Sequence, residues 1–467
     1  METLDFKSRL HFNEFPPIST EEWEATIESD LKGKNYKEIL KWNSVEGVAP
    51  LPFYRKDQLE KLEHEPAPIF DSASWHILEL IDDLDIGQAN KHALLALENG
   101  ASGLRFSLPK SAVTSKSDLE VLLNDINIEF ISLHFESELS SLEVAGWLNE
   151  LINERQLSPE SLQICFSFDP FVNAIQSGKL ASMKTIKDII EKGDTSFRFS
   201  AVDAAYYGNA GANIIQQIAF SLGAGNEYLG LDFNLADDIH FNFSIGPNYF
   251  LEIAKFRAFK LTWKKVLEQY GVEGADKFLT AEIASWNKSK TDAHNNLLRA
   301  TTEAMSASLG GCDAISVFRF DHHFAEPSGF TSRISRNIQI ILQEEAYLDK
   351  VADPGAGSYY IEKLTDMIAA ESWKLFQEIE QKGGFYECLK DGFIQHLIST
   401  SREQKIQAYK EKKEVLVGVN KYVPEEVKEV VFKPKEVPDL NIADNKLTDI
   451  EKVEPLSIEA ELQQGDA

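Results

Sequence analysis

Eight short β-rich runs, each followed by apolar residues at helical spacing, constrain the fold of this 467-residue chain most strongly. The runs are 75–81, 103–108, 129–135, 162–168, 196–201, 239–245, 278–284 and 314–320. The clearest helical pattern lies at 248–271, and its apolar side comprises Phe250, Ile253, Phe256, Leu261 and Val266. Strands that alternate with helices form a parallel sheet, and eight strands favour a closed (β/α)8 TIM barrel. Because periodicity does not reveal closure, an open doubly wound sheet remains the alternative.

The segments outside this pattern divide the chain further. Residues 1–73 contain a helix start and a proline-rich stretch, and we expect them to form an N-terminal arm that contacts another subunit. Residues 74–330 form the predicted barrel, and 331–422 a helical segment packed on it. Residues 423–467 contain four prolines and many acids, which predicts an acidic, flexible tail.

The charge balance argues against several classes of function. Seventy-five acidic and 47 basic residues give a net charge of −28, which repels phosphate backbones and anionic lipids. No run approaches the roughly 20 apolar residues that span a bilayer, and the N-terminus lacks the pattern of a signal peptide. Cys165, Cys312 and Cys388 are widely spaced and odd in number, as buried thiols in a reducing compartment would be. We therefore expect a cytoplasmic protein that binds neither nucleic acid nor membrane.

Polar residues near the predicted C-terminal ends of the strands are the candidate site residues, because a barrel of this kind works at that face. They are Asp82, Asp83, Lys110, His134, Glu136, Asp169, Asp203, Tyr206, Tyr207, Trp286, Arg319, Asp321, His322 and His323. Such side chains can be general acids, bases or ligands, but any one of them is more often a loop residue without a chemical task. The group 321–323 invites a metal, yet two adjacent histidines point to different sides and no third ligand follows, so we predict no metal site.

Three further motifs resemble cofactor sites. The glycine-rich segments 222–230 and 352–358 lack the dinucleotide-binding spacing, and we expect a helix end at the first and a tight interhelical loop at the second. The triplet Asp292-Ala293-His294 resembles the start of a corrinoid-binding motif. Leu297 stands where that motif needs glycine, so we predict no corrinoid site here.

Long motifs over residues 15–422 resemble the methylmalonyl-CoA mutase family, and most closely its small (beta) subunit. The arm-like motifs are FPPISTEEWEATIESDLKG (15–33) and EGVAPLPFY (46–54). The others are LEIAKFRAFKLTW (251–263), TTEAMSASLGG (301–311), SRISRNIQIILQEE (332–345), DPGAGSYYIEKLT (353–365) and LVGVNKY (416–422). Because they occur in the family's order, the resemblance supports the barrel.

The chain departs from the family's catalytic members in three places. Their Arg-Gly-Pro-Tyr-x-Thr-Met-Tyr segment corresponds here to 56–77, which has no glycine and no such pattern. Aligning the end of their Gly-Tyr-His-Met-Gln-Glu-Ala-Gly-Ala motif on 210–212 places Tyr206 at the catalytic histidine. After 416–422 only about 45 residues follow, too few for a cobalamin-binding Rossmann-like domain.

The resemblance implies a heterodimeric, adenosylcobalamin-dependent mutase that interconverts (R)-methylmalonyl-CoA and succinyl-CoA. This chain would be its non-catalytic partner, without catalytic, cofactor-binding or metal residues of its own, while a large catalytic subunit binds the cofactor and the acyl-CoA. The alternatives are a catalytic acyl-CoA mutase chain of the isobutyryl-CoA type, with its cobalamin domain on a separate polypeptide, and a barrel with new chemistry on Asp321, His322 and Arg319. A binding module for cobalamin enzymes is the remaining possibility.

Overall fold

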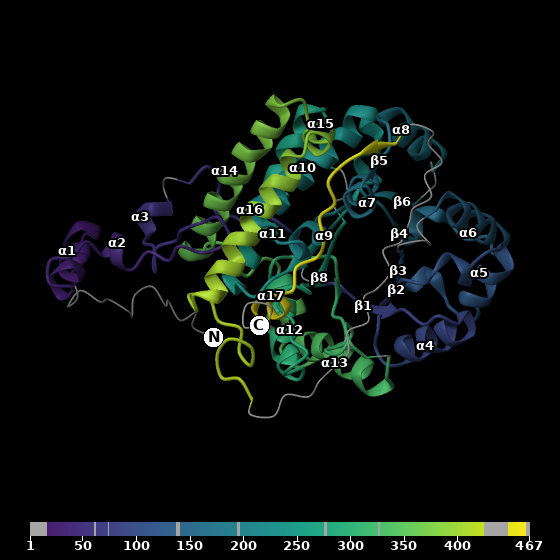
Figure 1. Ribbon diagram of the computed structural model, residues 1–467, viewed down its shortest axis with the longest axis horizontal. Helices are drawn as coiled ribbons and strands as arrows, with labels where there is room; N and C mark the ends of the chain where they lie inside the picture. The colour runs from purple at the N-terminus through teal and green to yellow at the C-terminus, as the bar shows by residue number, and fades with distance from the viewer. Residues whose placement is uncertain are drawn as a thin grey trace, which may run out of the picture.

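Eight parallel strands close into a barrel in this computed structural model, in the order β1-β2-β3-β4-β6-β7-β8-β9 (Figure 1). The structure describes residues 16–59, 62–72, 74–136, 141–193, 197–274, 278–325, 327–424 and 447–463. The strands are β1 (His76–Ile81), β2 (Gly103–Phe106), β3 (Ser132–Phe135), β4 (Gln163–Phe168), β6 (Arg198–Asp203), β7 (His240–Ile245), β8 (Leu279–Ile283) and β9 (Ala314–Ser316). Pairing of β1 with β9 completes the ring, so the predicted (β/α)8 barrel is confirmed and the open sheet is excluded.

Helices follow each strand of the barrel. They are α4 (Ile86–Glu98), α5 (Lys116–Leu122), α6 (Leu142–Glu154), α7 (Pro170–Ser177), α8 (Met183–Lys192), α9 (Ala204–Asn209), α10 (Ile214–Leu231), α11 (Tyr249–Gln269), α12 (Asn295–Leu309) and α13 (Gly329–Glu344). Several begin at a serine whose hydroxyl accepts a hydrogen bond from the first turn, as Ser141 does from the amide of Val144. This capping fixes where each helix leaves the preceding loop.

The two faces of the strands differ in chemistry. Arg105 of β2 reaches Glu282 of β8 across the ring, which identifies its face as the barrel interior. The alternate positions carry Phe106, Phe135 and Phe166, whose rings stack at 5.9 and 5.0 Å on the side of the helices. Branched aliphatic residues usually fill a barrel of this kind, so an interior with ionic side chains is unusual.

The helical layer is doubled on one side of the barrel, where α14 (Tyr359–Gln381) lies against α10 and α11 (Figure 1). The helix predicted at 248–271 is confirmed as α11. Of its predicted apolar side, Ile253, Phe256 and Val266 are buried, whereas Phe250, in the first turn, is 53% exposed. The helix end expected at 222–230 comes directly after that segment, because α10 ends at Leu231. Gly225 lies inside α10, where a Cβ would come within 2.8 Å of the Trp263 ring. The tight loop expected at 352–358 is confirmed, since it precedes α14.

The N-terminal segment projects from the barrel (Figure 1). It contains α1 (Thr20–Asp30), α2 (Tyr36–Ile39) and α3 (Lys56–Leu59). The ring of Trp23 packs edge-on against Phe53 at 4.3 Å, and Phe53 in turn stacks on Tyr36. No residue of α1 is buried, so this helix contributes little to the core of the chain.

The C-terminal segment corrects one prediction. Residues 447–463, expected to be part of a flexible tail, form β10 (Thr448–Asp449) and α17 (Ile458–Gln463). β10 pairs with β5 (Lys179–Leu180), and Leu456 and Ile458 are buried. The segment is too small to fold alone, but the barrel loops supply the apolar surface that it lacks. The rest of the predicted tail lies outside the described residues, apart from Val423 and Pro424.

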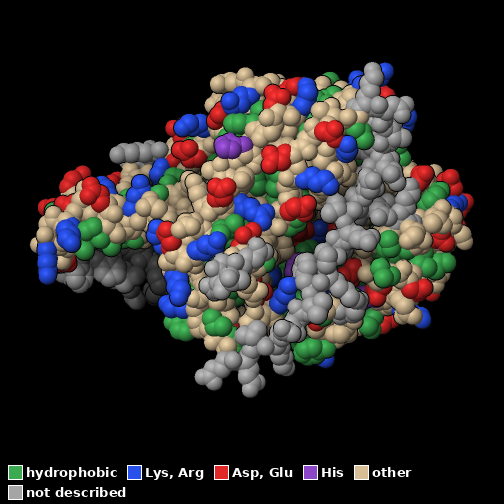
Figure 2. Space-filling model, viewed as in Figure 1, with side chains coloured by type: hydrophobic (Ala, Val, Ile, Leu, Met, Phe, Trp, Pro, Cys, Tyr) green, Lys and Arg blue, Asp and Glu red, His purple; other side chains and the backbone are tan. Residues whose placement is uncertain are grey.

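Acidic and basic side chains are interspersed on the face shown in Figure 2. In the described ranges, every helix is too short or too polar to cross a membrane.

Candidate functional site

The predicted site residues near β1 and β9 meet at the C-terminal end of the barrel. The guanidinium of Arg319 donates to both carboxylate oxygens of Asp82, at 3.0 and 3.3 Å. His322 Nδ1 lies 3.5 Å from the same carboxylate, and Asp321 lies 3.8 Å from Arg319. His323 packs its ring edge-on against His322 at 5.0 Å. The group is a compact ion-pair network in which Arg319 neutralises the acids.

Asp83 points away from this network. Its carboxylate lies 2.7 Å from Nδ1 of His92 on α4, and the other ring nitrogen lies 3.6 Å from Glu79. Glu79 is paired with Arg336 of α13 at 3.1 Å. Burial acts to lower the pKa of His92, but its two carboxylate partners raise that pKa to about 9. Asp83 therefore links the end of β1 to α4, and Glu79 links β1 to both α4 and α13.

An ionic cluster crosses the barrel interior. Arg105 forms ion pairs with Glu136, which follows β3, and with Glu282 of β8, the latter at 2.6 Å. Glu282 also accepts hydrogen bonds from the side-chain amides of Asn209 and Asn242, at 3.2 and 3.3 Å. These contacts join opposite sides of the ring. The side chains of this cluster occupy space along the axis of the barrel that an open channel would need.

Two carboxyl groups beside this cluster have pKa values above their usual range. Asp203 accepts a hydrogen bond from Asn242 at 2.8 Å, and burial, with repulsion from Glu282 and Asp169, raises its pKa to about 8. Asp169 accepts from the amides of Phe171 and Asp203, and burial raises its pKa to about 6. Such groups can act as general acids where a substrate reaches them.

Of the two remaining non-aromatic candidates, one lies inside a strand and the side chain of the other is not described. His134 lies within β3, 3% exposed, and bonds the Ser132 hydroxyl at 2.9 Å. Burial, then the charge of His240, holds its pKa well below the usual range, so the ring is neutral. Lys110 begins the 3-10 turn Lys110–Ala112, and its side chain lies outside the described part of the structure.

The aromatic candidates have structural partners. Tyr206 of α9 donates its hydroxyl to the carbonyl of Val453 at 2.7 Å. Tyr207 is fully buried and packs edge-on against Phe220 at 5.5 Å. Trp286, after β8, is 3% exposed, and its carbonyl accepts from the amide of Ile458. Two of these three residues therefore bind the C-terminal segment.

The contact between the C-terminal segment and the barrel was not predicted from the sequence. Its one local signal is Ser457, a helix-capping residue, directly before the apolar Ile458. The hydroxyl of Ser457 accepts a hydrogen bond from the amide of Ala460 and so caps the first turn of α17. That signal predicts a short helix but not where it docks.

The described residues do not fit a cobalamin site. Their sheets are the closed barrel and the two-stranded β10–β5 pair, and neither is the open parallel sheet of a Rossmann-like domain. His294 of the corrinoid-like triplet directly precedes α12 without a side-chain capping bond, and its ring packs on Phe320 at 5.3 Å. Within the described ranges, no three His, Cys, Asp or Glu side chains come together as metal ligands.

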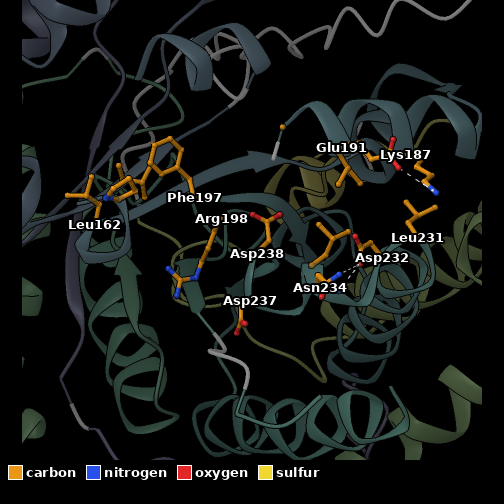
Figure 3. Close-up of a pocket in the computed structure, with 15 residues that line it drawn as sticks. Leu162, Lys187, Glu191, Phe197, Arg198, Leu231, Asp232, Asn234, Asp237 and Asp238 are labelled. Carbon is orange, nitrogen blue, oxygen red and sulfur yellow. Dashed lines mark hydrogen bonds and ion pairs between the residues drawn. The ribbon is translucent and has the colours of Figure 1, made fainter. Parts of the chain in front are cut away.

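A cavity of about 560 Å³ lies at the opposite, N-terminal end of the barrel (Figure 3). It opens beside the starts of β4 and β6, and its acidic lining comprises Glu191, Asp232, Asp237 and Asp238. Lys187 pairs with Glu191 at 3.6 Å. None of the predicted site residues lines this cavity.

The closed ring and the polar residues at its C-terminal end define a (β/α)8 barrel protein with an ion-paired mouth. The family model of methylmalonyl-CoA mutase matches residues 87–464. The chain belongs to this family of isomerases, and the resemblance read from its motifs is confirmed.

Named relatives agree with the small-subunit resemblance. The methylmalonyl-CoA mutase small subunit of Porphyromonas gingivalis is 34% identical over 438 residues, covering 88% of this chain and 71% of the relative. The small subunit of Streptomyces virginiae is 27% identical, and the match covers 88% of this chain and 71% of the relative. Methylmalonyl-CoA mutase of Escherichia coli is 27% identical and covers 86% and 64%. The chain thus spans about two thirds of the length of each relative.

Proposed function

We propose that this chain is the small, non-catalytic subunit of a heterodimeric, adenosylcobalamin-dependent methylmalonyl-CoA mutase. In this account the large subunit binds the cofactor and interconverts (R)-methylmalonyl-CoA and succinyl-CoA. The observation that carries the proposal is the hydrogen bond from Tyr206 to Val453. Tyr206 aligns with the family's catalytic histidine, and a phenol committed to the chain's own backbone does not perform the task of an imidazole.

The barrel interior supports the same proposal. A catalytic chain needs space for its substrate, whereas Arg105 here bridges Glu136 and Glu282 across the ring. Replacing the substrate space by ion pairs leaves a rigid scaffold whose outer surface is free to serve as an interface.

The N-terminal arm supports the existence of a partner. Four of its apolar residues are 39–55% exposed: Ile18, Ile39, Leu40 and Trp42. Apolar side chains on a projecting segment gain stability when another subunit covers them. We place the complex in the cytoplasm, where a reducing environment suits the three buried cysteine thiols.

Reconstitution tests the proposal. The chain alone, the large subunit alone and their mixture are assayed for mutase turnover with adenosylcobalamin. We expect turnover only in the mixture, together with a stable complex on size-exclusion chromatography. Turnover by this chain without the large subunit would contradict the proposal and favour a catalytic acyl-CoA mutase chain that borrows a cobalamin domain.

The arm is tested by a matched pair of variants. Trp42→Glu places a charge on the arm, and Leu95→Glu places one on α4, where Leu95 is 52% exposed. We expect Trp42→Glu to weaken the affinity for the large subunit by about 30-fold or more, as buried aromatic residues do at interfaces. Leu95→Glu should leave that affinity unchanged, and equal effects of both variants would contradict a role for the arm.

A further inference from the structure

Residues 447–463, here called the strap, run along the barrel toward its C-terminal end (Figure 1, yellow). The amide of Ile450 donates to the carbonyl of Gly178 at 3.0 Å, and that of Val453 to Ile175 at 3.3 Å. The first half of the strap therefore follows the end of α7 by backbone bonds, which depend little on side-chain identity.

The second half lies on the loops that follow β6 and β8. Val453 accepts the hydroxyl of Tyr206, and the amide of Leu456 donates to the carbonyl of Asn209 at 2.7 Å. The amide of Ile458 donates to Trp286 at 3.1 Å. In a barrel enzyme these same loops receive the substrate.

A carboxylate fastens the end of the strap. Glu459, 3% exposed, accepts from the Ser289 hydroxyl at 2.8 Å and from the amides of Lys290 and Thr291 at 2.8 and 3.0 Å. Nearby, Arg402 of α16 (Phe393–Lys410) donates to the carbonyl of Glu454 and pairs with Glu461. A buried carboxylate with three donors is a strong attachment point.

Apolar packing adds to these bonds. Leu456 and Ile458 share a buried cluster with Trp286, Tyr409 and Leu416. These residues come from the strap, the β8 loop, α16 and the segment after it. The strap thus joins the barrel mouth to the C-terminal helices by the burial of apolar surface.

Asn209 links the strap to the barrel interior. Its carbonyl accepts from Leu456, its side-chain amide donates to Glu282 at 3.2 Å, and its amide oxygen accepts from Ser285 at 2.8 Å. Displacing the strap therefore disturbs the residue that orders the ionic cluster beneath it.

We propose that the strap is a built-in occupant of the barrel mouth, which holds the β6 and β8 loops closed over the interior with Tyr206 as its central anchor. The inference rests on the proposed non-catalytic function, because a catalytic barrel needs these loops free for substrate. In this chain the position of the family's catalytic histidine serves to bind the strap.

Amide hydrogen exchange of the full chain tests the strap. In the wild type we expect peptides covering 447–463 to exchange far more slowly than an unstructured chain. Tyr206→Phe keeps the ring and removes the hydroxyl, and the strap should then exchange about fivefold faster, the effect of one lost hydrogen bond. Tyr270→Phe is the matched control, since its hydroxyl bonds Asn226 on the surface, and it should leave the strap unchanged.

An unprotected wild-type strap, or a folded Tyr206→Phe variant with unchanged strap exchange, would overturn the proposal. If Tyr206→Phe does not fold, Glu459→Gln decides by the same criterion, because it weakens the other attachment point. The measurement uses the isolated chain and no turnover. A negative result for the strap proposal is therefore distinguishable from a negative result for the proposed function, which is tested by mutase activity.

Discussion

The hydroxyl of Tyr206 lies 2.7 Å from the carbonyl oxygen of Val453, although 247 residues separate the two along the chain. This hydrogen bond connects α9, which follows β6, with the strap. It gives a physical reason for a tyrosine at the position that the motif resemblance assigns to the family's catalytic histidine. The side chain here stabilises a contact within the chain.

Gly225 and Gly230 of α10 are expected to respond oppositely to substitution by alanine. A Cβ on Gly225 would come within 2.8 Å of the Trp263 ring, whereas one on Gly230 meets nothing within 4 Å. Gly225→Ala should therefore lower the free energy of unfolding by about 1–3 kcal/mol. Gly230→Ala should raise it by about 0.5–1 kcal/mol through helix propensity. Urea denaturation measures both, and equal effects would contradict the packing at Gly225.

Arg257 is expected to be essential for stability. Its fully buried guanidinium pairs with Asp353 and, at 2.9 Å, with Glu362, and both carboxylates are also fully buried. Arg257→Ala leaves two buried carboxylates without the guanidinium that they share, with His64 as the remaining ring partner of Glu362 at 2.7 Å, and should cost about 3–5 kcal/mol. Lys187→Ala removes the exposed pair with Glu191 and should cost less than about 0.5 kcal/mol. A similar loss of stability in both variants would contradict this assignment.

Asp203 should make the chain less stable at alkaline pH. Its folded pKa of about 8 exceeds the usual value, so the folded state binds the proton more tightly than the unfolded state. The stability from this group is present at low pH and is lost as the pH rises through 8. Asp203→Asn keeps an acceptor for Asn242 and should melt at a higher temperature than the wild type at pH 8.5. The difference should shrink toward pH 5, and a constant difference would contradict the assignment.

His92 should stabilise the folded chain in its charged, protonated form, whereas Asp203 does so in its neutral form. Because its folded pKa of about 9 exceeds the unfolded value of 6.5, its contribution is complete below pH 6.5 and is lost as the pH rises through 9. His92→Gln should therefore be less stable than the wild type by about 1–3 kcal/mol at pH 6, with a smaller difference at pH 9.5. Asp83→Asn removes a partner of the ring and should weaken this pH dependence in urea denaturation. An unchanged dependence would contradict the pairing.

Much of the barrel could be predicted because strand and helix patterns are local. Every one of the eight β-rich runs overlaps a barrel strand, although β6 continues to Asp203, two residues past the run at 196–201. The third strand begins late, at Ser132, because residues 128–130 turn as a 3-10 helix. Local patterns fail where distant chain decides burial. Phe250 is exposed although its helix is largely buried, and Gly225 lies within a helix because Trp263 needs the space.

The candidate site was predictable as a location but not as a set of contacts. The sequence places Asp82 and Arg319 at strand ends, and their pairing follows from the closure of the barrel. It also places His134 near a strand end, whereas that side chain is enclosed in the interior. The strap was not predictable, because its composition indicates an unfolded tail and its stability comes from contacts more than 150 residues away, at Ser289 and Tyr206.

Mutase turnover of the reconstituted complex, with substitutions confined to this chain, tests the central claim most directly. Tyr206→His places an imidazole at the position that the motif resemblance assigns to the family's catalytic histidine, and Asp203→Asn removes the carboxyl group near the mouth whose pKa is raised to about 8. If this barrel performs no chemistry, both variants should turn over within about twofold of the wild-type complex. A rate that falls about 100-fold in Asp203→Asn, while the two subunits still copurify, would show that this barrel takes part in the reaction and would contradict the account.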